Sequence, residues 1–414
     1  MQSADLPTTS SSTRTAAMAG RWRGLDAFRG LAVIGMLLVN NPGNHDAVYT
    51  QLEHSAWHGC TIADLVFPFF LFVVGITTTI SLTAMARRGD DAAARARIWR
   101  RATIIVGIGV ALNWFPFYQS GDIPWTTHPG LPDRMAERLL LLRIPGVMQR
   151  IGVAYLAAAL IAWRASSRTI AIGILALLIG YWLLLTVVPV PSEGVIGAAV
   201  LDHPARTIVA HTDRALFDWT RWGLGNHLWD SALTWDPEGA LSTVSSVATV
   251  LLGVVCGRWT LSRTPEQRLR PLFVVGAAAM VVGWCWSFVY PLNKPLWTGS
   301  YVVYTAGVGA VLLGILGALL DGRARARWSQ PFIAFGANPL IAYAGSELAR
   351  RILHSSIKLR ATGGRIGLDE WTTRQIENVG LAPKAASLAW ALLFLAAWWL
   401  VLSRLSRRRL FVRV

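Results

Sequence analysis

The sequence predicts an all-α protein, a polytopic bundle of about ten transmembrane helices. Three observations predict this fold: the composition, the succession of apolar segments, and the placement of the basic residues. Of the 414 residues, 53% are hydrophobic and only 15% are charged. An ordinary soluble domain carries about 25% charged residues, so this chain lacks the charge that a soluble surface needs. The composition also excludes a disordered chain and a disulfide-rich scaffold.

Apolar segments follow one another along the chain, and most of them are long enough to span a bilayer. The short segment at 101–114 is expected to extend or tilt. Since one span takes about 20 residues, about ten spans account for the apolar fraction. The candidate spans lie at 26–41, 62–86, 101–114, 144–163, 169–190, 238–257, 271–291, 298–320, 331–354 and 385–403.

Basic residues gather in every second connection between these spans. Six of them lie between the second and third spans: Arg87, Arg88, Arg95, Arg97, Arg100 and Arg101. The connection at 42–61 contains no lysine or arginine. The positive-inside rule therefore predicts that both termini are cytoplasmic. It also accounts for most of the net charge of +16, so we do not expect a nucleic-acid partner. Basic residues at 350–365, on the expected outer side, depart from this pattern.

The domain organisation predicted from the sequence is simple. Residues 1–20 are rich in serine, threonine and alanine and contain no apolar segment, so we expect a disordered cytoplasmic tail rather than a signal peptide. Residues 21–414 are expected to form a single transmembrane domain. The three cysteines, Cys60, Cys256 and Cys285, fit neither a metal site nor a disulfide framework.

Polar residues gather in the connections that the topology places outside the membrane. Asp64 falls in the first turn of the span at 62–86, which Thr61 is expected to cap. Asp64 either serves as a cap only, or orients a histidine that acts as a general base. The spacing does not choose among His45, His54 and His58. His54 and His58 are four residues apart, but Gly59 argues against a helical metal-binding pair, so we expect no metal.

Several charged and polar residues fall within or beside the spans. Arg150 lies about two turns inside an apolar helix, where a charge must be paired or face a polar cavity. Glu238 and Glu347 are its two candidate partners. Asp26 and Arg29, at the start of the first span, form either a structural ion pair or a site for an anion. Pro339, after Asn338, is expected to break the ninth span and free backbone groups that line a cavity.

Several segments together resemble the heparan-alpha-glucosaminide N-acetyltransferase family, including its bacterial members without the extra lumenal domain. They occur in the family's order: LDAFRG from Leu25, HSAWHGCTIADLVFPFF from His54, RIPGVMQR from Arg143, DPEG from Asp236, NKPLWTGSY from Asn293 and GANPLIAY from Gly336. The resemblance implies an enzyme that takes acetyl from cytoplasmic acetyl-CoA and delivers it to an amino sugar across the membrane. It also implies a homodimer in the inner membrane of a bacterium. Because the large lumenal region of the lysosomal enzyme is lacking here, we expect an acceptor other than heparan.

The resemblance assigns His54 as the active histidine and Asn40 as an active-site asparagine. We expect His54 to act as general base, Asp64 to orient it, and Asn40 to stabilise the developing oxyanion. An acetyl-histidine intermediate is the alternative mechanism. The expected acetyl-CoA ligands are Arg29, Asp26, Arg150 and Asn338. The expected sugar ligands are Trp57, Glu238, Asp236, Lys294 and Trp297.

Two other functions remain open at this stage. In a sugar transporter, Arg150, Glu347 and the proline-broken ninth span would form a substrate path. That function predicts inverted repeats, which the sequence does not show. In a non-catalytic scaffold for cell-envelope enzymes, the charges within the spans would have no purpose.

Overall fold

A computed structural model describes residues 22–411 apart from 87–88, 119–125, 127, 129, 192, 322–325 and 362–363. Within these residues it contains fourteen α-helices and one two-stranded antiparallel sheet. The predicted helical character is therefore confirmed. The disordered tail predicted at 1–20 lies outside the described residues.

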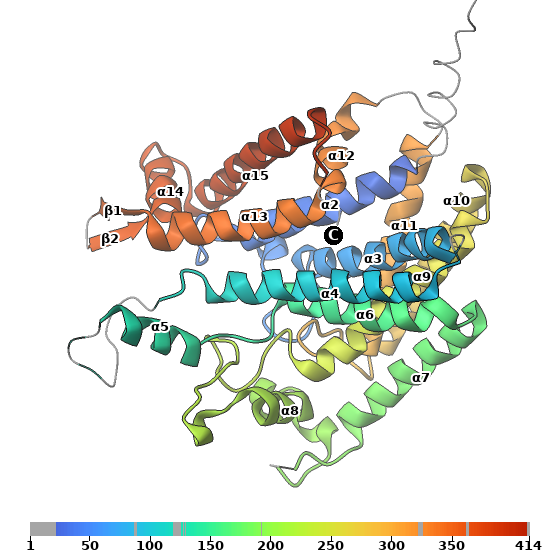
Figure 1. Cartoon of the computed structure of the whole chain (residues 1–414), viewed down its shortest axis with the longest axis horizontal. Coiled ribbons are helices and arrows are strands. Elements are labelled where there is room, and N and C mark those ends of the chain that lie inside the picture. Colours follow the sequence, from blue (N-terminus) through green and yellow to red (C-terminus); the bar gives the residue numbers. More distant parts are fainter. Residues whose placement is uncertain are drawn as a thin grey trace, which may run out of the picture.

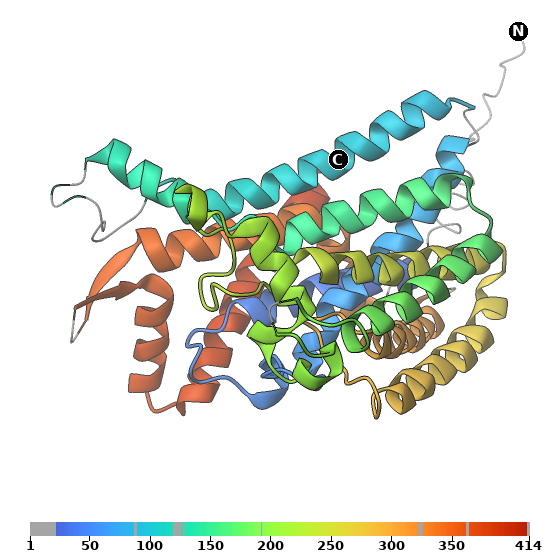
Figure 2. The same ribbon diagram turned by 90° about the horizontal axis from the view of Figure 1, so that it is seen from below.

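The helices that form the bundle run side by side (Figures 1 and 2). They are α2 (Arg23–Asn40), α3 (Ile62–Ala86), α4 (Asp91–Trp114), α6 (Val147–Arg164), α7 (Ser167–Thr186), α9 (Ala240–Leu261), α10 (Pro265–Trp286), α11 (Gly299–Leu320), α12 (Gln330–Ala337), α13 (Pro339–Arg351) and α15 (Pro383–Arg407). Each predicted span falls on one of these helices or, for the ninth, on two. In the described part of the chain, six helices are long and apolar enough to cross a membrane: α3, α7, α9, α10, α11 and α15. The count of ten spans and the cytoplasmic termini stay predictions.

The short predicted span at 101–114 extends at its start, as its length indicated. α4 begins at Asp91 rather than at 101, because the Asp90 carboxylate caps it by accepting from the Ala93 N–H at 2.9 Å. Arginines that we expected in a connection therefore lie on the first turns of α4. The ninth span is broken between α12 and α13 at Asn338, as Pro339 predicted.

Shorter elements occupy the long connections. They are α5 (Leu131–Leu140), α8 (Ile208–Phe217), α14 (Leu368–Asn378), and strands β1 (Lys358–Ala361) and β2 (Gly364–Gly367). α5, α14 and the two strands gather at one end of the bundle, at the left of Figure 1, and α8 lies below the middle of that view. We call that end of the bundle the His54 end, because the α2–α3 connection that carries His54 also lies there. The opposite end, where α4 begins, is the arginine end.

α3 lies at the centre of the bundle. It packs against α2, α6, α9 and α11, and 72% of the residues in its most apolar 18-residue stretch are buried. Its Phe67, Leu71 and Val74 belong to the largest hydrophobic cluster, and Phe69, Phe72 and Val73 to a second one. A helix that is apolar on all sides is expected at the centre of such a bundle. α3 therefore fixes the positions of the residues around it.

Glycines bring α2 and α12 into direct backbone contact. A Cβ atom on Gly30 would lie 1.7 Å from the Phe332 carbonyl oxygen, and one on Gly336 would lie 2.2 Å from the Asp26 carbonyl oxygen. Small residues allow this close approach in membrane helices. The LDAFRG and GANPLIAY segments are therefore two sides of one helix crossing.

The crossing predicts a difference between two glycine-to-alanine variants. We expect Gly30→Ala to lower the free energy of unfolding by about 1–3 kcal/mol, because its methyl group has no space. Gly107→Ala, in α4, is the control, because no atom lies within 4 Å of its added Cβ. Thermal unfolding of the detergent-purified protein measures both. A Gly30→Ala variant as stable as the wild type would contradict the crossing.

Candidate active site

The Asp64 carboxylate is the centre of a polar cluster at the His54 end. Its side chain is 1% exposed. Oδ2 accepts from the Ser55 backbone N–H at 3.1 Å, from the Ser55 hydroxyl at 2.7 Å, and from the Thr61 N–H at 3.1 Å. The last bond is one half of a capping box at the start of α3. Asp64 thus caps its own helix and closes the 55–61 loop at the same time.

The other Asp64 oxygen faces His54. His54 Nδ1 lies 2.8 Å from Asp64 Oδ1, and 43% of the His54 side chain is exposed. An ionised carboxylate accepts a hydrogen bond, so it places the proton on Nδ1 and leaves the lone pair on Nε2. The contact between Asp64 and a histidine that the sequence indicated is present, and it selects His54.

Lys294 completes this cluster. Its Nζ lies 3.0 Å from Nε2 and 3.1 Å from Nδ1 of His54, and 3.8 Å from Asp64 Oδ1. Burial lowers the pKa of Lys294. Asp64 and Lys294 therefore both contact the His54 ring, which stays accessible.

The loop between α10 and α11 holds Lys294 in this position. Asn293 Nδ2 donates to the Trp57 carbonyl at 3.0 Å, and the Gly59 N–H donates to the Leu292 carbonyl at 2.8 Å. The Tyr301 hydroxyl donates to the Asp64 carbonyl at 2.5 Å. The HSAWHGCTIADLVFPFF and NKPLWTGSY segments are therefore bonded to each other, and together they form the His54 cluster.

The other candidate histidines lie apart from Asp64. His58 Nε2 lies 2.8 Å from Asp202, and its Nδ1 faces Asn293. His45 borders a small cavity beside Arg350 and Asp369. Burial raises the pKa of the Cys60 thiol to about 12, so this neighbour of the cluster stays protonated. His54 alone of the three histidines contacts the Asp64 carboxylate among the described residues.

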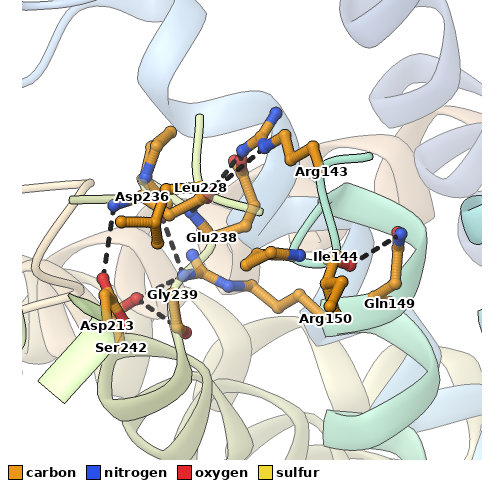
Figure 3. Close-up of polar contacts among 12 residues, drawn as sticks. Arg143, Ile144, Gln149, Arg150, Asp213, Leu228, Asp236, Glu238, Gly239 and Ser242 are labelled. Carbon is orange, nitrogen blue, oxygen red and sulfur yellow. Dashed lines mark hydrogen bonds and ion pairs between the residues drawn. The ribbon is translucent and has the colours of Figure 1, made fainter. Parts of the chain in front are cut away.

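A second polar cluster, buried under the loop at 235–239, surrounds Arg143 (Figure 3). Arg143 Nε lies 2.8 Å from Asp236 Oδ2, and one Nη lies 2.6 Å from both Asp236 Oδ1 and Glu238 Oε2. Asp213 accepts from the N–H groups of Asp236 and Ala240 and so caps α9. Although burial opposes the charge, the two carboxylates raise the pKa of Arg143. Burial raises the pKa of Asp213 to about 7.

Arg150 extends this cluster into the bundle. It is 1% exposed, and it donates to the Pro237 carbonyl, the Ser242 hydroxyl and the Thr243 hydroxyl. Its guanidinium lies 4.9 Å from the centre of the Trp297 ring. Neither predicted partner forms an ion pair with it among the described residues, because Glu238 bonds Arg143 and Glu347 bonds Arg350 and Arg351. Neutral oxygen acceptors surround the Arg150 side chain, and the binding of a cofactor by Arg150 stays a prediction.

Two of the expected sugar ligands are buried side chains. Trp297 is fully buried, with Arg150 over its ring and its Nε1 bonded to Thr249 Oγ1 at 3.0 Å. Asp236 is 0% exposed, and both its oxygens bond Arg143. Neither side chain is accessible to a sugar. Trp57 is half-buried, and its Nε1 donates to the Leu201 carbonyl, while Glu238 is 10% exposed.

A cavity of about 660 Å³ lies on another side of α3. Its lining runs on α3 from Phe70 to Met85, about 22 Å along the helix axis. Three arginines and no acidic residue belong to this lining within the described part of the chain. The lining consists of Arg29, Phe70, Val74, Ser81, Ala84, Met85, Arg97, Arg101, Ile105, Met148, Ile151, Tyr155, Ala337, Pro339, Leu340, Tyr343 and Phe411.

The remaining expected residues lie around this cavity or at the His54 end of the bundle. Arg29 lines the cavity and donates to Asp26 at 3.0 Å. Asn338 is buried at the α12–α13 break, between two lining residues. Asn40 ends α2 at the His54 end, half-buried. The sequence prediction did not include Arg97 and Arg101 in the site, because it placed both in a connection. Their four-residue spacing could have indicated that they share one face of a helix.

Comparison with known proteins confirms the resemblance. Residues 21–205 match the family described as heparan-alpha-glucosaminide N-acetyltransferase, catalytic. The human heparan-alpha-glucosaminide N-acetyltransferase is 29% identical, over 84% of this chain and 56% of the human protein. The mouse protein of the same name is also 29% identical, over 80% of this chain and 54% of its own length. The chain thus spans about half the length of the curated relatives it matches.

The Arg143 cluster predicts a large loss of stability on substitution. We expect Arg143→Gln to lower the free energy of unfolding by about 3–5 kcal/mol, because it leaves two buried carboxylates without their cation. Arg206→Gln is the control: Arg206 pairs with Glu193 but is 49% exposed, so the expected loss is below about 1 kcal/mol. Thermal unfolding in detergent compares the two. Equal losses would contradict the buried character of the Arg143 cluster.

Proposed function

We propose that this chain is a membrane acetyltransferase. It binds acetyl-CoA in the 660 Å³ cavity and transfers the acetyl group to the amino group of a glucosamine-type sugar at the His54 end. One observation carries this proposal: the arginine-lined cavity runs along α3 toward the end at which Asp64 and Lys294 hold His54. The names of the relatives, N-acetyltransferases of a glucosaminide, support the same reaction.

The cavity has the chemistry that acetyl-CoA requires. The phosphates of CoA need cations, and Arg29, Arg97 and Arg101 supply them, although Arg29 also pairs with Asp26. The pantetheine arm is long and largely uncharged, and it fits the apolar part of the lining, which includes Phe70, Ile105, Met148, Ile151 and Leu340. A volume of 660 Å³ lies within the usual range of small-molecule sites.

The arm must carry the thioester beyond the cavity to reach His54. Asp64 lies six residues before Phe70 on α3, about 9 Å along the axis. His54 itself is outside the described lining, so the last part of the path opens when the donor binds. Tyr343 and Met148 line the cavity on the two helices that flank this path, α13 and α6.

His54 acts as general base in the proposed reaction. Nε2 takes a proton from the sugar amine as its nitrogen attacks the thioester carbonyl. The carbon–sulfur bond then breaks, and CoA leaves as the thiolate, which takes up a proton. Asp64 holds the Nδ1 proton and stabilises the imidazolium that forms. Lys294, beside Nε2, and Asn40, at the end of α2, are the groups that can donate to the oxyanion.

The charge pattern and the resemblance also support a proposed orientation and location of the protein in the cell. The arginine end faces the cytoplasm, where acetyl-CoA is present, and the His54 end faces outward. The protein is then a multi-pass protein of a bacterial inner membrane, and the resemblance implies a homodimer. The transporter alternative receives no support, because Arg150 and Glu347 are bonded within separate clusters.

The first functional prediction concerns His54. We expect His54→Ala to lower the rate of CoA release from acetyl-CoA and glucosamine by about 100-fold or more, because the general base is lost. Purified wild-type and variant proteins are compared with a thiol reagent that detects free CoA. His58→Ala, in the same loop but bonded to Asp202, is the control and retains most of the activity.

Two outcomes would contradict the proposal. His54→Ala at the wild-type rate would remove His54 from the mechanism. Uptake of glucosamine into proteoliposomes without acetyl-CoA would favour the transporter. Radiolabel retained on the wild-type protein without acceptor, and lost in His54→Ala, would select the acetyl-histidine route over direct transfer.

The second functional prediction concerns the donor site. We expect Arg97→Gln and Arg101→Gln each to raise the KM for acetyl-CoA by about 10-fold or more with little change in kcat, because each removes a charge-assisted phosphate contact. Arg95→Gln is the control, since Arg95 lies on the same helix, pairs with Asp91 and does not line the cavity. An unchanged KM in both variants would place the phosphates elsewhere.

A further inference from the structure

The segment that follows α15 turns back onto the bundle. Arg408 ends the helix, and the backbone of Arg409 takes the left-handed conformation, with φ of 56°. The Leu410 N–H then donates to the Leu405 carbonyl at 3.0 Å, and the Arg409 N–H to the Ser406 carbonyl at 3.1 Å. These two bonds form a Schellman-type helix end. A residue other than glycine at such a position is strained, so the reversal needs contacts that hold it.

The α12–α13 break supplies one of these contacts. Asn338, which is 1% exposed, donates through Nδ2 to the Leu410 carbonyl at 3.2 Å. The next residue, Phe411, then joins the lining of the 660 Å³ cavity, together with Ala337 and Pro339 on either side of Asn338. The break in the ninth span therefore positions the segment after α15 at the cavity.

The exposure of Phe411 and the residues that share its cavity indicate which kind of ligand it can contact. It is 43% exposed, so part of its surface is accessible to a ligand. The same lining holds Arg29, Arg97 and Arg101, and no acidic residue within the described part of the chain. An accessible aromatic ring that shares a cavity with several cations is suited to a flat heteroaromatic base that carries phosphates.

We propose that Phe411 is a binding residue for the nucleotide end of the donor, and that the adenine ring of CoA packs against it. This inference rests on the proposed function, because it assumes that the cavity is the acetyl-CoA site. Arg29, Arg97 and Arg101 hold the phosphates, and Asn338 holds the Arg408–Phe411 segment in place. Asn338 thus acts on the donor through the Leu410 carbonyl, as a positioning residue.

Direct binding tests this inference without relying on turnover. Calorimetry on the purified full chain measures the Kd of two probes, CoA and adenosine 3′,5′-bisphosphate, which is the nucleotide end alone. We expect Phe411→Ala to weaken both by about 5- to 150-fold, the range of a lost base–aromatic contact. Phe411→Trp restores binding. Leu410→Ala is the control, because its side chain does not line the cavity and its carbonyl remains.

S-acetylpantetheine is a donor that lacks the nucleotide. It tests whether Phe411 contacts the nucleotide or only supports the shape of the cavity. We expect the KM for S-acetylpantetheine to be the same in wild type and Phe411→Ala, while the KM for acetyl-CoA rises. Unchanged Kd values for both probes in Phe411→Ala, or an equal rise in KM for both donors, would overturn the role of Phe411. A wild-type protein that binds neither probe would overturn the donor site itself, and with it the proposed function.

Discussion

The Asp64 carboxylate is the group on which the His54 end depends. It is buried, and it bonds the backbone and side chain of Ser55, the backbone of Thr61, and the ring of His54. One anion therefore starts the central helix, closes the loop above it and fixes a histidine ring. A buried carboxylate is unfavourable unless its oxygens are occupied, so these contacts form together. Lys294, in the loop between α10 and α11, adds the cation that such an anion favours.

The six segments that carry the resemblance meet in three pairs. LDAFRG and GANPLIAY cross at Gly30 and Gly336. The His54 segment bonds the NKPLWTGSY loop, and RIPGVMQR bonds DPEG through Arg143 and Arg150. Trp297 links the last two pairs, because it lies under Arg150 while its own loop carries Lys294. The first pair joins them through Phe28, whose ring centre lies 5.5 Å from that of Phe69 in the His54 segment, so residues far apart in the sequence form one continuous structure.

Much of this structure could be predicted from the sequence, for definable reasons. Apolar length located every long helix, and the position of Asp64 after a capping threonine indicated its contact with a histidine. The periodicity could not locate the start of α4, because its first turns are charged and only the Asp90 cap marks them. The burial of Asp236 and Trp297 depends on partners from other helices, which spacing along the chain does not reveal. Arg150 was rightly identified as a buried charge, but its neutral acceptors on α9 carry no sequence signal.

The early start of α4 has a consequence for how such a protein can evolve. Arg97 and Arg101 line the cavity, and they also belong to the basic group that the positive-inside rule would place on the cytoplasmic side. In the proposed function, the same two residues therefore serve two traits, insertion topology and ligand recognition. A neutral replacement would then change both traits at once, whereas a lysine replacement would keep the positive charge and alter only the recognition geometry. Under this proposal, few amino acids can replace either arginine.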